Sequence, residues 1–90
     1  MMFEVAFTTA SVRSLKRCVG KNPARRKRFE KSLATFIEDP YAEALRTHKL
    51  SGKLKERWSF TVEYYLRVIL RFLDNGNAVF EEIGGHDDVY

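Results

Sequence analysis

The fold is decided by the second half of the chain, residues 48–90, which read HKLSGKLKERWSFTVEYYLRVILRFLDNGNAVFEEIGGHDDVY. Most of this stretch alternates apolar and polar side chains, which is the pattern of half-buried β-strands. We expect strands over residues 53–62, 64–73 and 78–83. The run Asp74-Asn75-Gly76-Asn77 predicts a tight hairpin between the last two, because Asn-Gly supplies the positive φ angles of a type I′ turn.

The alternation gives the first two of these strands an apolar face and a charged face. On the strand 64–73 the apolar positions are Leu66, Val68, Leu70 and Phe72. The opposite positions are Tyr65, Arg67, Ile69 and Arg71, and the preceding strand adds Lys53, Lys55 and Arg57 to the charged face. The sequence therefore predicts a sheet with one buried face and one cationic face.

The first half of the chain predicts one more strand and two helices. Alternation over residues 3–8 indicates a first strand. A first helix follows, capped by Thr8, Thr9 or Ser11 and ending near Gly20.

The second helix begins at Asn22 and Pro23, which suit the N-cap and the first helical position. It carries an apolar stripe at helical spacing and ends before Pro40. The stripe consists of Phe29, Leu33, Phe36 and Ile37. Residues 41–52 fit neither period and are interpreted as an ordered loop.

The order of elements is thus strand, two helices and three strands (β-α-α-β-β-β). Two helices packed on one face of an antiparallel sheet of about four strands make a two-layer α+β fold. Ninety residues form a single domain with one modest core. The face that the helices leave uncovered is open to solvent or to a ligand.

The chain carries a net charge of +4, and this charge is unevenly distributed. Residues 1–40 hold nine Lys or Arg and four Asp or Glu, which gives +5, whereas residues 41–90 hold seven and eight, which gives −1. A basic domain favours an anionic partner such as nucleic acid, an acidic protein or a membrane surface. A merely soluble surface explains the charge equally well.

Four consecutive cations, Arg25–Arg28, crowd the positive end of the second helix dipole. Their position suggests that they meet an anion, either RNA phosphate or an acidic partner protein. A solvated and screened run of charge is the alternative interpretation.

The cytoplasm is the expected location. Cys18 is the only cysteine, so no intrachain disulfide can form, and we interpret it as a small core residue rather than a reactive thiol. No apolar run approaches about 18 residues, so we expect no transmembrane helix. The first residues, MMFEVAFTTA, lack the basic and long apolar regions of a signal peptide.

Candidate functional residues lie on and around the charged face. Its five cations would form a positive surface suited to phosphate, and Tyr65 on the same face could stack on a base; a solvated sheet face is the alternative. His48 and His86 are the only histidines, and imidazole exchanges protons near neutral pH. Both fall in loop or tail positions, so an acid–base role and a merely structural one are both open. No metal-ligand spacing, glycine-rich phosphate loop or dinucleotide motif occurs, so no metal and no cofactor are expected.

Four motifs then point to a known family. They are Leu45-x-x-His48-x-Leu50-x-Gly52-x-Leu54-Lys55, Trp58-Ser59-Phe60, Tyr65-Leu66-Arg67-Val68-Ile69 and Glu82-Ile83-Gly84-x-His86-Asp87-Asp88-Val89-Tyr90. Together with the order of elements, these motifs resemble the RelE/ParE superfamily of toxins from type II toxin–antitoxin modules. Within it, the chain is most similar to the RelE/YafQ-like mRNA interferases.

The resemblance implies a metal-independent endoribonuclease that cuts mRNA in the ribosomal A site. In such enzymes a 2′-hydroxyl attacks its own neighbouring phosphate. The implied partners are mRNA, the ribosome and a small antitoxin that wraps the toxin, and no cofactor is implied.

The same resemblance implies roles for individual residues. Arg67 would clamp the scissile phosphate, His86 would be the acid or the base, and Tyr90 would stack on or orient the RNA. His48 would be a second acid–base or orienting group. The expected RNA-binding set is Lys53, Lys55, Arg57, Arg71 and Tyr65, of which the two lysines would also contact ribosomal RNA.

The chain departs from the family at two places. YafQ-like members have a further His and an Asp where this chain has Thr61 and Tyr65, so the acid–base groups would be differently supplied. A Gly that is common before the Trp-Ser pair is absent, and Glu56 and Arg57 fill that stretch.

Three other functions fit the sequence. A ParE-like toxin would inhibit DNA gyrase without cutting RNA, and in it His86 and Tyr90 would be dispensable. A non-catalytic basic adaptor would bind an acidic protein and leave RNA untouched, and a decayed relative would not be toxic.

Overall fold

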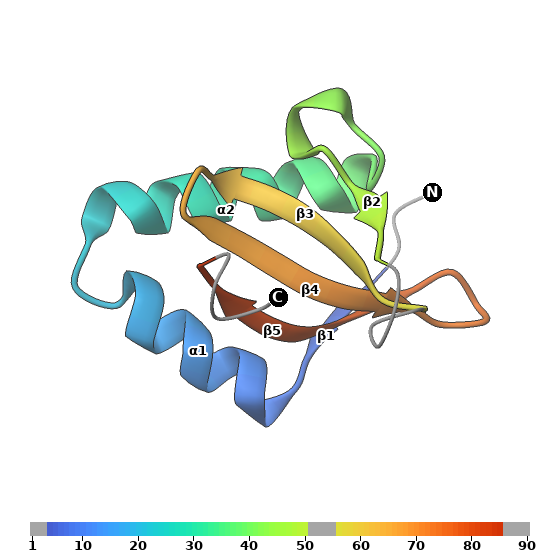
Figure 1. Ribbon diagram of the computed structural model, residues 1–90, viewed down its shortest axis with the longest axis horizontal. Coiled ribbons are helices and arrows are strands. Elements are labelled where there is room, and N and C mark those ends of the chain that lie inside the picture. The colour runs from blue at the N-terminus through green and yellow to red at the C-terminus, as the bar shows by residue number, and fades with distance from the viewer. Residues whose placement is uncertain (1–3, 51–55, 86–90) are drawn as a thin grey trace.

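The chain folds into a five-stranded sheet with two helices on one side (Figure 1). The computed structural model describes residues 4–50 and 56–85. The elements are β1 (Val5–Phe7), α1 (Thr9–Val19), α2 (Pro23–Glu38), a 3-10 helix η1 (Glu43–Leu45), β2 (His48–Lys49), β3 (Trp58–Glu63), β4 (Leu66–Phe72) and β5 (Ala78–Gly84). The α+β class and the order of the main elements are those predicted. Within the described ranges, neither helix combines the length and the apolar character that crossing a membrane requires.

Both helices begin at side-chain caps that the sequence predicts. The Thr8 hydroxyl accepts a hydrogen bond from the backbone N–H of Ser11 (3.0 Å) at the start of α1. The Asn22 side chain accepts one from the N–H of Arg25 (3.0 Å) at the start of α2. Each cap satisfies a backbone donor that the first turn of a helix leaves without a partner.

The strand order is β1-β5-β4-β3-β2, and the sheet is mixed. The antiparallel meander β3-β4-β5 is as predicted, but β1 pairs with β5 in the parallel direction. β2 is a fifth strand, antiparallel to β3, in a stretch that was predicted to be a loop. Alternation of side chains predicts that a segment is a strand, but pairing direction depends on the path of the chain between strands, and two residues are too few to show a period.

The predicted type I′ turn between β4 and β5 is wrong. Leu73 donates its N–H to the carbonyl oxygen of Asn77 (2.7 Å), and Gly76 donates to that of Leu73 (2.9 Å). Gly76 has φ +89°, whereas Asn75 is not among the described residues with positive φ. The loop therefore has three residues ending in a left-handed glycine, which is another common hairpin geometry.

The core lies between the helices and one face of the sheet. Phe36 of α2 is fully buried and stacks on Phe60 of β3, with 4.9 Å between ring centroids. Leu66, Val68 and Leu70 of β4 are buried in the same cluster, so the predicted apolar face is confirmed. The opposite sheet face, called the open face below, therefore carries the alternate residues of each strand.

Candidate functional site

Strand register shows which residues share the open face, because residues directly opposite in neighbouring strands point to the same side. One row across the sheet consists of Thr61, Arg67 and Gly84. The next row consists of His48, Ser59, Ile69 and Glu82. The predicted site residues Arg67 and His48 therefore lie on one face, in neighbouring rows.

Arg67 stands in β4 and is partly buried. Its Nη1 donates a hydrogen bond to the hydroxyl of Thr61 on the adjacent strand (2.8 Å). Its Nε is buried and has no hydrogen-bond partner in the described part of the chain. A buried charged donor without an acceptor is costly, and such a group is found where an acceptor has yet to bind.

His48 stands in the short strand β2 and is exposed. Its Nδ1 lies 3.0 Å from the carbonyl oxygen of Arg46. A carbonyl can only accept a hydrogen bond, so Nδ1 carries the proton in the neutral ring and Nε2 keeps its lone pair. Arg46 holds its carbonyl there with φ +52°, a left-handed conformation that is uncommon for arginine.

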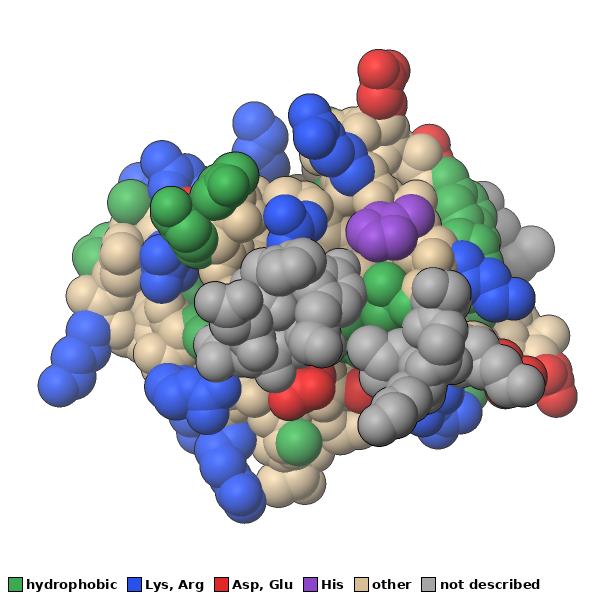
Figure 2. Space-filling view, viewed as in Figure 1, with side chains coloured by type: hydrophobic (Ala, Val, Ile, Leu, Met, Phe, Trp, Pro, Cys, Tyr) green, Lys and Arg blue, Asp and Glu red, His purple; other side chains and the backbone are tan. Residues whose placement is uncertain are grey.

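The two side chains are close enough to act on one group. They are separated by two strand spacings and two residues along the strands, which places their Cα atoms about 12 Å apart. A phosphate bound between the guanidinium and the imidazole would bridge that distance. In the space-filling view, histidine lies at the surface near Lys and Arg side chains (Figure 2).

Arg57 and Arg71, two of the predicted RNA-binding cations, share one carboxylate. Glu81 of β5 forms an ion pair with the Nε of Arg57 and another with the Nε of Arg71 (3.3 Å). Glu81 reaches both because it is the extra residue of a β-bulge: Ile69 pairs with Glu82 and Leu70 with Phe80. The cationic face is therefore partly neutralised by the chain itself.

Sequence reasoning missed this role of Glu81. Regular alternation assigns only one residue of a neighbouring pair to each sheet face, and Glu81 follows the buried Phe80 at the point where the register shifts. Two successive glutamates, Glu81 and Glu82, in an otherwise alternating strand were the signal of a bulge.

Tyr65 lies in the turn between β3 and β4 and not within a strand. Its side chain is 69% exposed, and its ring meets that of Tyr64 edge to face at 4.6 Å between centroids. The pair offers exposed aromatic surface at the end of the sheet that also carries Arg67. Such a surface is suited to stacking on an unpaired base.

The basic cluster Arg25–Arg28 meets an anion of its own chain. Arg25 Nε and Arg28 Nη1 donate hydrogen bonds to the two carboxylate oxygens of Glu63, at 2.5 Å and 2.6 Å. Burial of the Glu63 carboxylate raises its pKa, but the hydrogen bonds and charges of the two arginines outweigh this effect and hold the pKa below its usual value. Two of the four cations are thus accounted for by an intramolecular contact.

Four predicted site residues, Lys53, Lys55, His86 and Tyr90, lie outside the described residues. The expected convergence of His86 and Tyr90 on Arg67 therefore stays a prediction. In residues 4–50 and 56–85, no three His, Cys, Asp or Glu side chains are placed to hold a metal ion together.

This arrangement combines three chemical capabilities. Arg67 can bind a phosphate through a planar set of N–H donors, and His48 can take up a proton at Nε2. The exposed rings of Tyr64 and Tyr65 can hold a base nearby.

No protein-family model and no curated protein matches the sequence. Solved structures do match it over almost its whole length. A YoeB/ParE toxin from Agrobacterium tumefaciens has 13% identity and a TM-score of 0.79, covering 93% of this chain and 99% of that one. A mutant of YafQ from E. coli has 16% identity and a TM-score of 0.76, covering 98% of both chains.

A third similar structure is the toxin–antitoxin complex RelBE2 from Mycobacterium tuberculosis. It has 18% identity and a TM-score of 0.71, covering 96% of this chain and 100% of that one. At such identities the likeness is one of fold. This chain has the fold of the RelE/YafQ-like toxins, as the sequence motifs predict.

Proposed function

We propose that this chain is the toxin of a type II toxin–antitoxin module and a metal-independent endoribonuclease that cleaves mRNA in the ribosomal A site. The main support is the open face around Arg67. A guanidinium held by Thr61, with a buried Nε–H that lacks an acceptor, lies within reach of an exposed imidazole on the same face. Phosphate cleavage without a metal needs a cation for developing charge and a group that moves protons.

In the proposed reaction, the 2′-hydroxyl of the RNA attacks the adjacent phosphorus. A base removes the hydroxyl proton, the bond from phosphorus to the 5′-oxygen breaks, and an acid protonates that leaving oxygen. Arg67 binds the non-bridging oxygens and stabilises the charge that they gain. His48 and His86 supply the base and the acid, and Tyr90 orients the RNA.

The remaining cations would position the strand. Lys53 and Lys55 add charge to the phosphate-binding face and contact ribosomal RNA. Arg57 and Arg71 stay close to the strand through their shared carboxylate, and Tyr65 stacks on a neighbouring base.

The test is to express the chain in growing cells and to map the 5′ ends of mRNA by primer extension. We expect growth arrest and new cuts inside translated codons, both lost in Arg67→Ala and in His86→Ala. Arg17→Ala is the matched control, because it removes one exposed cation from α1, away from the open face. Intact mRNA during growth arrest would contradict the proposal.

The same experiment separates the alternatives. Growth arrest with intact mRNA and damaged DNA, unaffected by His86→Ala, would favour a ParE-like inhibitor of DNA gyrase. No growth arrest and no cuts would favour a non-catalytic adaptor.

A cognate antitoxin is the expected protein partner. Solved structures similar to this chain include the E. coli DinJ–YafQ toxin–antitoxin complex, with a TM-score of 0.74 and 16% identity. On this chain, a cavity of about 430 Å³ between α1 and α2 is lined by apolar side chains and edged by cations. Its lining includes Val12, Leu15, Val19, Phe29, Lys16 and Arg26, and Val12 is 39% exposed.

An apolar segment with acidic neighbours would complement this groove. We expect Val12→Glu to abolish rescue by the antitoxin encoded beside this chain while the toxin stays active. The control Ala34→Glu places the same charge on an exposed position of α2 outside the groove and should leave rescue intact. Equal rescue of both variants would place the antitoxin elsewhere.

A further inference from the structure

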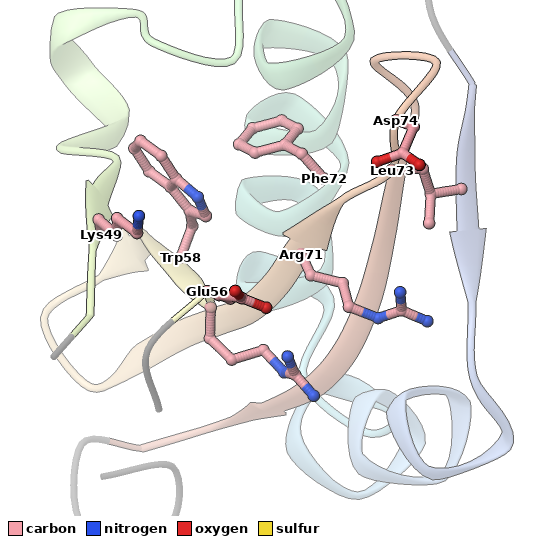
Figure 3. Close-up of a pocket in the computed structure, with 8 residues that line it drawn as sticks. Lys49, Glu56, Trp58, Arg71, Phe72, Leu73 and Asp74 are labelled. Carbon is pink, nitrogen blue, oxygen red and sulfur yellow. The ribbon is translucent and has the colours of Figure 1, made fainter. Parts of the chain in front are cut away.

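A hollow of about 510 Å³ lies at the end of the sheet away from Thr61 and Arg67. Figure 3 shows Lys49 on β2, Trp58 on β3 and Arg71 and Phe72 on β4 around it, and Arg57 completes this side of the lining. Successive strand residues alternate between faces, so the hollow joins the open face to aromatic rings of the covered face. Its volume is in the range of small-ligand sites.

The hollow combines rings with guanidinium groups. Trp58 and Phe72 pack edge to face with 5.5 Å between their centroids, and Trp58 is only partly buried. Arg57 and Arg71 converge on Glu81, which fixes the two guanidinium groups near each other. An aromatic ring beside guanidinium groups is the combination that binds a base together with its phosphate.

Two carboxylates, Glu56 and Asp74, also line the hollow. They would repel an acidic peptide, whereas they can accept hydrogen bonds from the amino group of adenine, guanine or cytosine. The lining therefore matches a nucleobase with an attached phosphate better than it matches a simple polyanion.

We propose that this hollow is a nucleotide subsite, in which a base of the RNA strand lies against Trp58 and its phosphate meets Arg71 and Arg57. The inference deepens the proposed nuclease function and rests on it. Arg71 follows Arg67 by four positions on β4, which is about 13 Å along the strand and on the same face. A single strand bound at Arg67 and running along β4 reaches the hollow within a few nucleotides, so the subsite selects the base at one fixed distance from the cut.

The only tryptophan of the chain, Trp58, reports on occupancy directly. The experiment titrates the whole protein with 2′-O-methyl oligonucleotides of about four nucleotides, which cannot be cleaved by a 2′-hydroxyl, and follows tryptophan fluorescence. We expect saturable quenching, weakened about tenfold or more by Arg71→Ala, since a charge-assisted hydrogen bond is lost. Arg17→Ala removes one charge far from the hollow and should leave the affinity within about twofold.

Three results would overturn the subsite: no quenching, equal weakening by Arg71→Ala and Arg17→Ala, or equally tight quenching by an oligoglutamate peptide. Melting curves of each variant establish that it is folded. Arg67 does not line the hollow, so Arg67→Ala should abolish cleavage and keep the quenching. Cleavage by the unaltered chain without quenching refutes the subsite alone, whereas Arg71-dependent quenching without cleavage refutes the nuclease function and leaves nucleotide binding established.

Discussion

At the residue scale, the state of His48 follows from one backbone contact. The Arg46 carbonyl fixes the proton of the neutral ring on Nδ1, which leaves Nε2 as the basic nitrogen. We expect ¹⁵N chemical shifts of His48 at alkaline pH to show the Nδ1–H tautomer as the main form. A dominant Nε2–H form would mean that the base proposed for cleavage is wrongly placed.

The contact between Arg67 and Thr61 gives a second prediction at this scale. Thr61→Val keeps the shape of the side chain but removes the oxygen that accepts the hydrogen bond from Arg67 Nη1. A bond of this kind is worth about 1 kcal/mol, so the rate of RNA cleavage should fall about tenfold. Thr61→Ser retains the hydroxyl and should keep most of the rate, and both variants should melt near the temperature of the unaltered protein. Equal rates in the two variants would show that Thr61 does not position Arg67.

At the scale of elements, Glu63 joins the end of β3 to the first turns of α2. Its carboxylate is 18% exposed and accepts hydrogen bonds from both Arg25 and Arg28. We expect Glu63→Gln to lower the free energy of unfolding by about 1–2 kcal/mol at pH 7. Glu30→Gln removes an exposed pair with Arg26 and should cost less than about 0.5 kcal/mol, which makes it the matched control.

The pH dependence of this contribution has a definite sign. The pKa of Glu63 is lower in the folded chain than its unfolded value of about 4.3. The stabilisation is therefore fully present above the unfolded pKa and is lost as the pH falls through the folded-state pKa. Urea denaturation should show the difference between Glu63→Gln and the unaltered protein shrinking below about pH 4. A difference that stays constant down to pH 3 would contradict the ion pairs.

The elements that the sequence predicts are those with local causes. The caps Thr8 and Asn22 and the apolar face of β4 depend on neighbours in the sequence, and each is found where it was expected. The parallel pairing of β1 with β5, the strand β2 and the ion pairs of Glu81 depend on contacts between distant segments or on a bulge. No local pattern encodes those contacts.

The candidate site divides in the same way. Alternation along β4 was enough to place Arg67 on the open face, opposite the core. It could not indicate that Thr61 would accept a hydrogen bond from Arg67, or that Arg46 would orient His48, because both contacts depend on side-chain and loop geometry. His86 and Tyr90 stay predictions, since the described residues do not include them.

At the scale of the molecule, one aromatic residue ties the layers together. Phe36 of α2 is fully buried, and its ring contacts those of Phe60, Phe80 and Phe72, with centroids 4.9 Å, 5.3 Å and 6.1 Å away. These rings come from all three strands of the meander, so a single helix side chain connects α2 to the sheet that carries the open face.

The consequence is a large loss of stability when this ring is removed. Phe36→Ala should lower the free energy of unfolding by about 3–5 kcal/mol, because it removes apolar contacts and leaves a cavity. A chain of this length has a total stability of about 5–13 kcal/mol, so the variant retains little margin. Phe36→Leu fills most of the space and should cost about half as much.

Denaturation in urea followed by circular dichroism measures both variants. Equal losses for Ala and Leu would indicate that the cavity collapses and that the ring contacts contribute little. Because the core supports the face on which Arg67 and His48 lie, Phe36→Ala should also lose toxicity, but by unfolding. Arg67→Ala should lose toxicity with its melting transition intact, and this contrast separates damage to the fold from damage to the site.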